Sequence, residues 1–244
     1  WGKFFLPFAA SSCKAEPQPK TISKSMPATE KTQASEGLPR KASRAARRQQ
    51  FIEATIATLA RNGYARTTLT EVAATAGLSH GLIIFHFETK ESLLSETLVF
   101  LAREYRDNWM QALSAAPDRP AAQLDAIIRA DFVDTICNPG RLGAWSALWG
   151  EIQSRPMYQA HGAAYDLEYA ETIERLCAAI IAEGGYPHDA DAVARVVRVT
   201  LEGLWFDLMT SDEPYPIEGA LSSMFQLAMA FFPKHFDKSG VMPD

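Results

Sequence analysis

The chain has few cysteines, and none lies at a spacing that suits a metal ion. Its 244 residues include only three, Cys13, Cys137 and Cys177. An odd number without close pairs favours a reducing cytoplasm over a disulfide framework. Long apolar runs are also missing, since none approaches the ~18 residues that a membrane span requires. We therefore expect a cytoplasmic protein with no membrane segment and no metal site.

Groupings of residues that support catalysis are missing too. No histidine pairs with Cys, Asp or Glu at the spacing of a metal site or a catalytic triad. The five histidines are His80, His86, His161, His188 and His235. No alternating polar and apolar segment is long enough for a useful strand, so no glycine-rich phosphate loop can follow one. The sequence predicts an all-α protein that is not an enzyme and needs no cofactor.

The beginning of the chain lacks large apolar residues. Residues 11–43 are rich in Ser, Lys, Pro, Glu and Ala, and we expect a disordered tail over residues 1–43. A lysine, a short apolar run and a cysteine within residues 3–13 imitate a secretion or lipoprotein signal, but a proline interrupts the run. An over-extended start of translation, with Met26 as the alternative first residue, is the competing interpretation.

Charge is divided unevenly along the chain. Residues 1–90 hold 13 Lys and Arg against 6 Asp and Glu, whereas residues 91–244 hold 11 against 23. A basic N-terminal part and an acidic C-terminal part suit a DNA-binding domain joined to a domain that avoids phosphate. The alternative is that the basic excess belongs to the tail, which contains some of these lysines.

Two short helices joined by a sharp turn are predicted over residues 68–87. Thr68 and Glu71 have the T-x-x-E spacing of a capping box at the start of the first helix. Gly77 follows that helix, where a left-handed end favours a residue without Cβ, and Ser79 can cap the second helix. This pattern is typical of a helix-turn-helix, in which the second helix lies in the DNA major groove. A plain helical hairpin is the alternative.

Periodicities of three and four predict further helices on both sides of this motif. A first helix should begin at Arg44 and end at Asn62-Gly63, with Phe51, Ile52 and Ile56 on its apolar face. A long helix should follow Thr89 as far as about Leu113. The remaining helices are expected at residues 121–137, 141–154, 157–183, 189–210 and 217–232. The whole chain should contain about nine helices.

A wider set of residues around the motif carries a family resemblance. These residues are Thr67-Thr68, Ala73-x-x-Ala76-Gly77-Leu78-Ser79-x-Gly81, His86-Phe87 and Lys90-Glu91-x-Leu93. From about Arg47 to Leu94 the chain resembles, without gaps, the TetR family of one-ligand transcriptional repressors. The resemblance implies a helix-turn-helix domain over residues 44–92, a ligand-binding and dimerisation domain over 93–234, and a flexible C-terminus over 235–244. It also implies a homodimer on a near-palindromic operator.

Under this interpretation, the motif supplies the DNA contacts. The candidates are Arg47, Arg48, Thr68, Thr70, Ser79, His80, Gly81, Leu82, Phe85, His86 and Lys90. The arginines can reach phosphate or the minor groove, or can simply be the solvated start of a helix. Leu82 and Phe85 can touch thymine methyl groups, whereas Ile83 and Phe87 should pack inward.

Aromatic residues gather in the second half of the chain with acidic residues between them. Trp145 and Trp149 are four residues apart and share a helix face. The effector-binding candidates are Trp109, Asp131, Trp145, Trp149, Tyr158, Tyr165 and Trp205, with Asp134, Glu151, Tyr169, Glu202 and Asp207 nearby in the pattern. Ring faces beside carboxylates suit a quaternary ammonium, which cannot donate an N–H bond. Ordinary core packing is the alternative for each aromatic residue.

A second set of residues narrows the resemblance. These are Arg47-Arg48-Gln49, Ile52-x-Ala54-Thr55, Ala144-Trp145-x-Ala147-x-Trp149, Pro156-Met157 and Gly203-Leu204-Trp205. They resemble the BetI branch of the family, which represses genes for choline uptake and conversion to glycine betaine. The run Leu82-Ile83-Ile84-Phe85 departs from relatives that carry hydroxyl groups there. A regulator of another catabolic or efflux operon, an activator, and a helical ligand-binding protein or enzyme that has lost DNA binding are the alternatives.

The resemblance also implies how two copies associate. The last two long helices, 189–210 and 217–232, should pair with those of a second copy into a four-helix bundle. The expected interface residues are Val193, Val197, Leu201, Leu204, Leu221 and Phe225.

Overall fold

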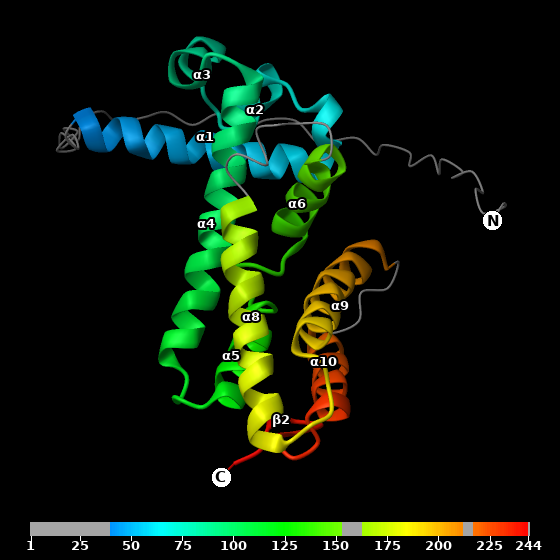
Figure 1. Ribbon diagram of the computed structural model, residues 1–244. Coiled ribbons are helices and arrows are strands. Elements are labelled where there is room, and N and C mark those ends of the chain that lie inside the picture. Colours follow the sequence, from blue (N-terminus) through cyan, green and yellow to red (C-terminus); the bar gives the residue numbers. More distant parts are fainter. Residues whose placement is uncertain (1–39, 153–162, 212–216, 244) are drawn as a thin grey trace, which may run out of the picture. The chain divides into compact units, whose positions relative to one another are not determined.

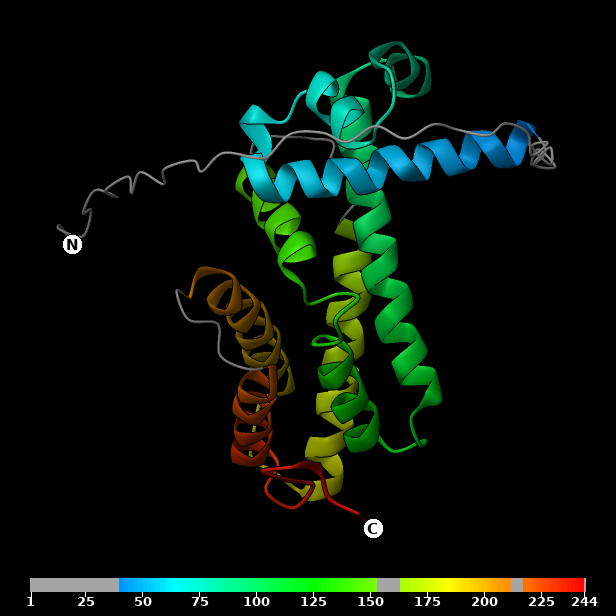
Figure 2. The same ribbon diagram turned by 180° about the vertical axis from the view of Figure 1, so that it is seen from behind.

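A computed structural model of the chain describes residues 40–152, 163–211 and 217–243, all within the compact unit Pro39–Asp244. These residues form nine helices and one short β-hairpin, which confirms the prediction of a helical fold (Figures 1 and 2). The helices are α1 (Arg40–Arg66), α2 (Leu69–Thr75), α3 (His80–Phe87), α4 (Lys90–Ala115), α5 (Pro120–Ala130), α6 (Pro139–Ile152), α8 (Ala163–Gly184), α9 (Ala190–Thr210) and α10 (Ile217–Phe231). The expected disordered tail up to residue 39 and Tyr158 lie outside the described residues.

The local signals of the predicted motif determine the boundaries of α2 and α3. The Thr68 hydroxyl accepts the backbone N–H of Glu71 at 3.2 Å, and the Ser79 hydroxyl accepts that of Leu82 at 3.3 Å. Gly77 adopts a left-handed φ of 65° between the two helices. Each cap satisfies an N–H that has no partner within its helix. The helix-turn-helix geometry is therefore present as predicted.

Two helix boundaries differ from the prediction. Helix α1 begins at Arg40 instead of Arg44, so its first residues lie in the segment predicted as a disordered tail. Its range extends to Arg66, but Gly63 has non-helical dihedral angles (φ 72°, ψ 174°) that separate two helical segments, which agrees with the predicted end at Asn62-Gly63. Helix α5 ends at Ala130 instead of reaching residue 137. Residue 131 is held by tertiary contacts instead: the Trp205 indole N–H donates to the Asp131 carbonyl oxygen at 3.0 Å. If α5 continued, the Asp131 carbonyl oxygen would accept the backbone N–H of residue 135. Its partner is the indole of Trp205 on α9.

The N-terminal head, α1 to α3, has its own apolar core, which also receives residues of α4 and α6. Phe51 of α1, Ile83 and Phe87 of α3, and Leu93 of α4 are each no more than 2% exposed. Phe51 and Phe87 meet edge to face with ring centroids 5.9 Å apart. Ala144, Trp145 and Leu148 of α6 join the same cluster. Helix α6 is thus built into the head through its contact with α1.

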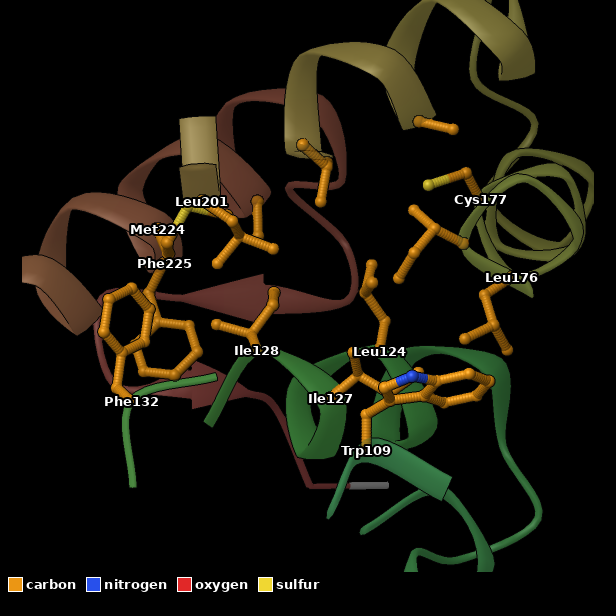
Figure 3. Packing of buried hydrophobic residues seen from close by; sticks show 14 of the residues in the cluster. Trp109, Leu124, Ile127, Ile128, Phe132, Leu176, Cys177, Leu201, Met224 and Phe225 are labelled. Atoms are coloured by element: carbon orange, nitrogen blue, oxygen red, sulfur yellow. The ribbon is translucent and has the colours of Figure 1, made fainter. Parts of the chain in front are cut away.

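A second core joins α4, α5, α8, α9 and α10 (Figure 3). Trp109, Leu124 and Ile127 pack with Leu176 and Cys177, whereas Ile128 and Phe132 lie nearer Leu201, Met224 and Phe225. Burial of the apolar side chains of the two cores is the main favourable contribution to the stability of the fold. Both described cysteines, Cys137 and Cys177, are buried and unpaired.

Residues 235–243 fold onto the body, whereas the sequence predicted a flexible C-terminus over residues 235–244. Strands β1 (Phe236–Asp237) and β2 (Gly240–Val241) pair antiparallel. Phe236 is 1% exposed, and the Asp125 carboxylate on α5 accepts the backbone N–H of Val241 at 3.0 Å. A buried aromatic ring and satisfied backbone groups hold this segment on the body, and the composition of so short a segment does not predict that contact.

Candidate DNA-reading surface and effector cavity

Helix α3 has two different faces. Ile83 and Phe87 are 0% and 2% exposed and pack inward, as predicted, whereas Phe85 is 66% exposed. His80 and Gly81 are also exposed, and Leu82 is half-buried. The Arg44 guanidinium lies 5.5 Å from the centre of the Phe85 ring. The outer face of α3 therefore offers an apolar ring beside a positive charge, with few hydrogen-bond donors.

The polar candidates of the motif lie at helix starts. Thr68, Thr70 and Ser79 are exposed in the first turns of α2 and α3 or at their caps. Helix starts carry free backbone N–H groups and a partial positive charge, which suit a phosphate. These three residues are therefore placed where a phosphate backbone can be contacted.

Arg48 and His86, both predicted to contact DNA, have partners within the head. The Arg48 guanidinium forms an ion pair with Glu96, donates to the His86 carbonyl oxygen, and lies over the Phe87 ring at 4.6 Å. The His86 side chain is buried, with its ring 5.8 Å from that of Phe51. Burial, helped by the nearby Arg48 charge, lowers the pKa of His86. Both side chains hold the head together.

Lys90 and Arg47 differ in how freely they can reach a partner. The Lys90 ammonium donates to the Tyr64 carbonyl oxygen at 2.9 Å and lies over the Tyr64 ring. Arg47 is exposed, and its contact is with Gln50, one turn along α1, at 2.8 Å. An exposed guanidinium exchanges such a local contact for a phosphate at little cost, whereas Lys90 helps to join α4 to the end of α1.

A cavity of about 310 Å³ lies among α4, α6, α8, α9 and the residue after α5. Five aromatic rings, three carboxylates, one guanidinium and one leucine line it: Tyr105, Trp145, Trp149, Tyr169, Trp205, Asp131, Asp166, Glu202, Arg198 and Leu201. The Trp145 and Trp149 rings lie 5.8 Å apart on one face of α6, and the Tyr105 and Trp205 rings lie 5.4 Å apart. The lining is rich in ring faces and in negative charge.

Asp131 is the most buried charged group of this lining, at 1% exposed. Its Oδ2 accepts hydrogen bonds from the Tyr169 hydroxyl at 3.0 Å and from the Tyr105 hydroxyl at 3.3 Å. Burial raises the pKa of Asp131 to about 7, although the two tyrosine hydrogen bonds oppose that rise. The buried carboxylate likewise helps burial to raise the pKa of both tyrosines, which therefore keep their protons.

The other charged residues of the lining are Asp166 on α8 and Arg198 and Glu202 on α9. Burial raises the pKa of Glu202, Arg198 lowers it and Asp166 raises it. Arg198 and Glu202 are four residues apart on α9, so they share one face with each other. Carboxylates outnumber guanidinium groups three to one around the cavity. A cation is therefore favoured there over an anion of the same size.

Only some of the predicted effector residues line the cavity. Four of them, Asp131, Trp145, Trp149 and Trp205, line the cavity. Trp109 does not: it is 1% exposed and packs behind Tyr169, with ring centroids 5.5 Å apart. Tyr165 does not line the cavity either, and its hydroxyl accepts a hydrogen bond from Arg103 at 3.2 Å.

Six residues of the lining were not among the predicted effector-binding residues, although Tyr169 and Glu202 were expected near them and Leu201 was assigned to the dimer interface. The six are Tyr105, Asp166, Tyr169, Arg198, Leu201 and Glu202. The spacing of Arg198, Leu201, Glu202 and Trp205 at three and four is a signal that places all four on one face of a helix. Tyr105 and Asp166 carry no comparable signal, because their positions depend on how α4 and α8 pack.

The residues predicted for dimerisation are mostly part of the protomer's own core. Val193, Val197, Leu201 and Phe225 are each no more than 4% exposed, and Leu204 and Leu221 are half-buried. The apolar side chains that α9 and α10 expose are instead Val196, Val199, Phe206 and Met229, of which Val199 and Phe206 are 58% and 56% exposed. Most of the residues that the resemblance implied for the interface therefore pack within one chain, and a different set of apolar side chains on α9 and α10 is exposed.

Two family comparisons cover most of this fold. Residues 51–97 match the family of bacterial regulatory proteins described as the tetR family, and residues 120–232 match the C-terminal domain of BetI-type transcriptional repressors. The first match contains α2, α3 and their caps, and the second contains nine of the ten lining residues. This chain belongs to the TetR family.

Individual relatives of this TetR-family protein agree with that assignment. It is 28% identical over 187 residues to the HTH-type transcriptional regulator BetI of Burkholderia thailandensis, covering 75% of this chain and 92% of the relative. A transcriptional regulator from Pseudomonas aeruginosa PAO1 has the same fold, with a TM-score of 0.68, 24% identity and coverage of 79% and 95% of the two chains. A regulator from Saccharomonospora viridis, solved in complex with choline, has a TM-score of 0.66 at 18% identity, covering 75% and 96%.

The family establishes the coarse function of the TetR-family chain. It is a helix-turn-helix, DNA-binding transcriptional regulator with a BetI-type C-terminal domain, and the prediction that it is not an enzyme is confirmed by that membership. Within the described ranges, no helix combines the length and the apolar character that crossing a bilayer requires. The same ranges contain no cluster of three or more His, Cys, Asp or Glu side chains that could hold a metal ion.

Proposed function

We propose that this protein is a repressor that a small quaternary ammonium cation, such as choline, releases from its operator. The observation that carries the proposal is the cavity lined by five aromatic rings and three carboxylates. A trimethylammonium group has no N–H to donate, so ring faces and a nearby anion are the groups that recognise it. The BetI-type C-terminal domain and the choline bound by the Saccharomonospora viridis protein support the same ligand class.

The rings and charges suggest how such a ligand would be held. Trp145 and Trp149 offer neighbouring ring faces, and each cation–π contact contributes about 0.5–2 kcal/mol. The ionised carboxylate of Asp131 supplies a negative charge where water is excluded, so its attraction for a cation is stronger than at the surface. A hydroxyl on the ligand can find partners among Glu202, Asp166 and Arg198.

Operator recognition would use the outer face of α3. His80, Gly81, Leu82 and Phe85 would meet base edges, and Thr68, Thr70, Ser79 and Arg47 would meet phosphates; their exposure supports these roles. Phe85 can contact thymine methyl groups. With few donors on this face, operator shape would contribute to specificity.

A homodimer would place two copies of α3 on a near-palindromic operator. The exposed apolar side chains of α9 and α10, Val196, Val199, Phe206 and Met229, support an interface between two copies of these helices. We propose these exposed residues for the interface in place of the largely buried ones that the family resemblance implied. Ligand binding would then favour a spacing of the two heads that does not fit two major grooves, through a difference in affinity between the two states.

A gel shift with the genomic DNA upstream of the gene tests the proposal. We expect the purified protein to retard this DNA, and choline chloride to reverse the retardation while it changes the fluorescence of Trp145 and Trp149. Binding of DNA that saturating choline leaves unchanged would exclude choline as the effector. Tetramethylammonium and glycine betaine, tested in parallel, would separate the need for the cation from the effect of an added carboxylate.

Two matched substitutions test the head assignment in the same assay. A Cβ at Gly81 meets open space, so Gly81→Glu should leave the fold intact but bring a negative charge toward phosphate. Ala182→Glu adds the same charge to an exposed position near the end of α8. We expect the first variant to lose DNA binding and the second to keep it. Equal DNA binding by both variants would contradict the proposed reading surface.

A further inference from the structure

One ion-pair cluster joins the three helices that connect the reading head to the cavity. Arg141, in the first turn of α6, binds Glu53 of α1 and Glu104 of α4. Its Nη1 donates to Glu53 Oε2 at 2.8 Å, while Nε and Nη2 each donate to a Glu104 oxygen at 2.9 Å. The Arg141 side chain is 18% exposed, so water screens these pairs less than it screens pairs on the open surface.

Helix α6 carries this cluster and the cavity on one stripe. Arg141, Trp145 and Trp149 follow each other at intervals of four residues, which places them along one side of a helix. Trp145 and Trp149 line the cavity, and Arg141 lies two turns before Trp149. A ligand that displaces the tryptophan rings therefore acts on the same helix side that holds the two glutamates.

Helices α6 and α1 are in close contact. A Cβ at Gly143 would lie only 3.0 Å from both Cα and Cβ of Ala60, so the two backbones approach closely. Farther along α1, the Gln50 side chain donates to the Ala76 carbonyl oxygen at the end of α2, at 2.8 Å. These contacts connect α6 through α1 to the turn of the helix-turn-helix.

We propose that Arg141 is a positioning residue that couples occupation of the cavity to the orientation of the reading head. This inference rests on the proposed function of the cavity and of α3. The planar guanidinium forms directional bonds to two carboxylates on different helices, so it selects one arrangement of α1, α4 and α6. A ligand that shifts α6 must change at least one of these bonds, which gives the two states of the head different energies.

Simple removal of Arg141 would leave Glu53 and Glu104 facing each other without a counter-charge, and this could unfold the head. The test therefore uses the neutralised triple variant Glu53→Gln, Arg141→Met, Glu104→Gln, with Arg141→Lys as a conservative variant. The matched control is Arg106→Met, because Arg106 also joins two helices, α4 and α8, through its ion pair with Glu168. That pair does not involve α6.

Three dissociation constants are measured for each protein: for choline by tryptophan fluorescence, for upstream operator DNA, and for the same DNA at saturating choline. In the wild type and in Arg106→Met, choline should weaken DNA binding by about tenfold or more, within the usual range of allosteric coupling. In the triple variant, choline and DNA should each bind within about threefold of the wild type, but choline should change DNA affinity by less than about threefold. Arg141→Lys should fall between these values.

A role in folding alone predicts a different result. It would lower the melting temperature and both affinities together while the ratio of DNA affinities with and without choline stayed constant. Wild-type coupling in the triple variant would overturn the inference. Failure of the wild type itself to bind DNA or choline would instead contradict the proposed function, and the inference with it.

Hydrogen exchange gives a second measurement that needs no effector. Because coupling between sites is reciprocal, operator DNA should slow amide exchange in α6 of the wild type as well as in α2 and α3. In the triple variant the protection should be confined to α2 and α3. Equal protection of α6 in the two proteins would show that Arg141 does not transmit the signal.

Discussion

The Tyr169 hydroxyl donates a hydrogen bond to Oδ2 of Asp131 at 3.0 Å, in the wall of a cavity lined with aromatic rings. The second carboxylate oxygen, Oδ1, is buried and has no hydrogen-bond partner among the described residues. A carboxylate removed from water and only half satisfied is unstable as an anion. A cation in the cavity would supply the missing stabilisation, so binding and ionisation of Asp131 should be linked.

Effector affinity should therefore depend on pH through Asp131, whose pKa burial raises to about 7. About a tenth of the carboxyl groups are ionised at pH 6 and about nine tenths at pH 8, and a cation prefers the ionised form. Choline affinity should rise by about tenfold between these values, as measured by titration calorimetry. Other charged or titratable groups also lie near Asp131. Glu202, whose pKa is also raised, Asp166 and Arg198 line the same cavity, and Asp134 and Cys137 are close to Asp131 in the chain.

The isosteric variant Asp131→Asn identifies the group responsible for this dependence. It should bind choline at least about tenfold more weakly than the wild type at pH 8, and its affinity should be nearly flat between pH 6 and pH 8. The variant should also be more stable than the wild type at pH 8. Folding raises the pKa of Asp131 from its unfolded value of about 4 to about 7, so the wild type's free energy of unfolding falls as pH rises through this interval. A wild-type pH profile in Asp131→Asn would assign the effect to another group.

Phe85 and Phe87 should separate DNA reading from folding, because α3 turns one ring outward and the other inward. Phe85→Ala should leave the melting temperature unchanged and weaken operator binding, by about 1–3 kcal/mol if the ring contacts a base. Phe87→Ala should cost about 3–5 kcal/mol of stability, because the ring is 2% exposed and packs on Phe51. Thermal unfolding and gel shifts on both variants check this contrast, and a destabilised Phe85→Ala would contradict it.

Gly77 and Gly81 should respond oppositely to alanine. Gly77 has a left-handed φ of 65°, so Gly77→Ala should destabilise the head by about 1–2 kcal/mol. Gly81 lies within α3 without a positive φ and with open space around it, so Gly81→Ala should be neutral or stabilise by up to about 1 kcal/mol. Urea denaturation measures both changes. Equal effects would mean that the turn does not depend on the left-handed residue.

The exposed apolar face of α9 should determine the oligomeric state. Phe206→Glu places a charge on a ring position that is 56% exposed in one chain, and it should convert a dimer to a folded monomer. Leu167→Glu changes an equally exposed apolar residue on α8 and should leave the dimer intact. Light scattering coupled to size-exclusion chromatography distinguishes the two masses. Dissociation by Leu167→Glu instead would move the interface to α8.

The amino-acid sequence by itself determined the local structure of the head. Thr68, Gly77 and Ser79 act through their own backbone neighbours, so their spacing predicted the caps and the turn of the helix-turn-helix. The four-residue interval between Trp145 and Trp149 likewise predicted a shared helix face, because helical geometry alone sets that relationship. Asp131, Trp145 and Trp205, which the sequence singled out as effector-binding candidates, line one cavity.

Only the tertiary structure decided which side of each helix meets which neighbour. The family resemblance implied Val197 and Phe225 for a dimer interface, but both pack within the chain, whereas Val199 and Phe206 are exposed. Periodicity predicts an apolar face on a helix, but it does not predict which element packs against that face. Tyr105 reaches the cavity because α4 and α8 pack side by side, and Arg141 meets two glutamates because α6 lies against α1 and α4. These contacts join residues 37 to 88 positions apart, and no local rule encodes them.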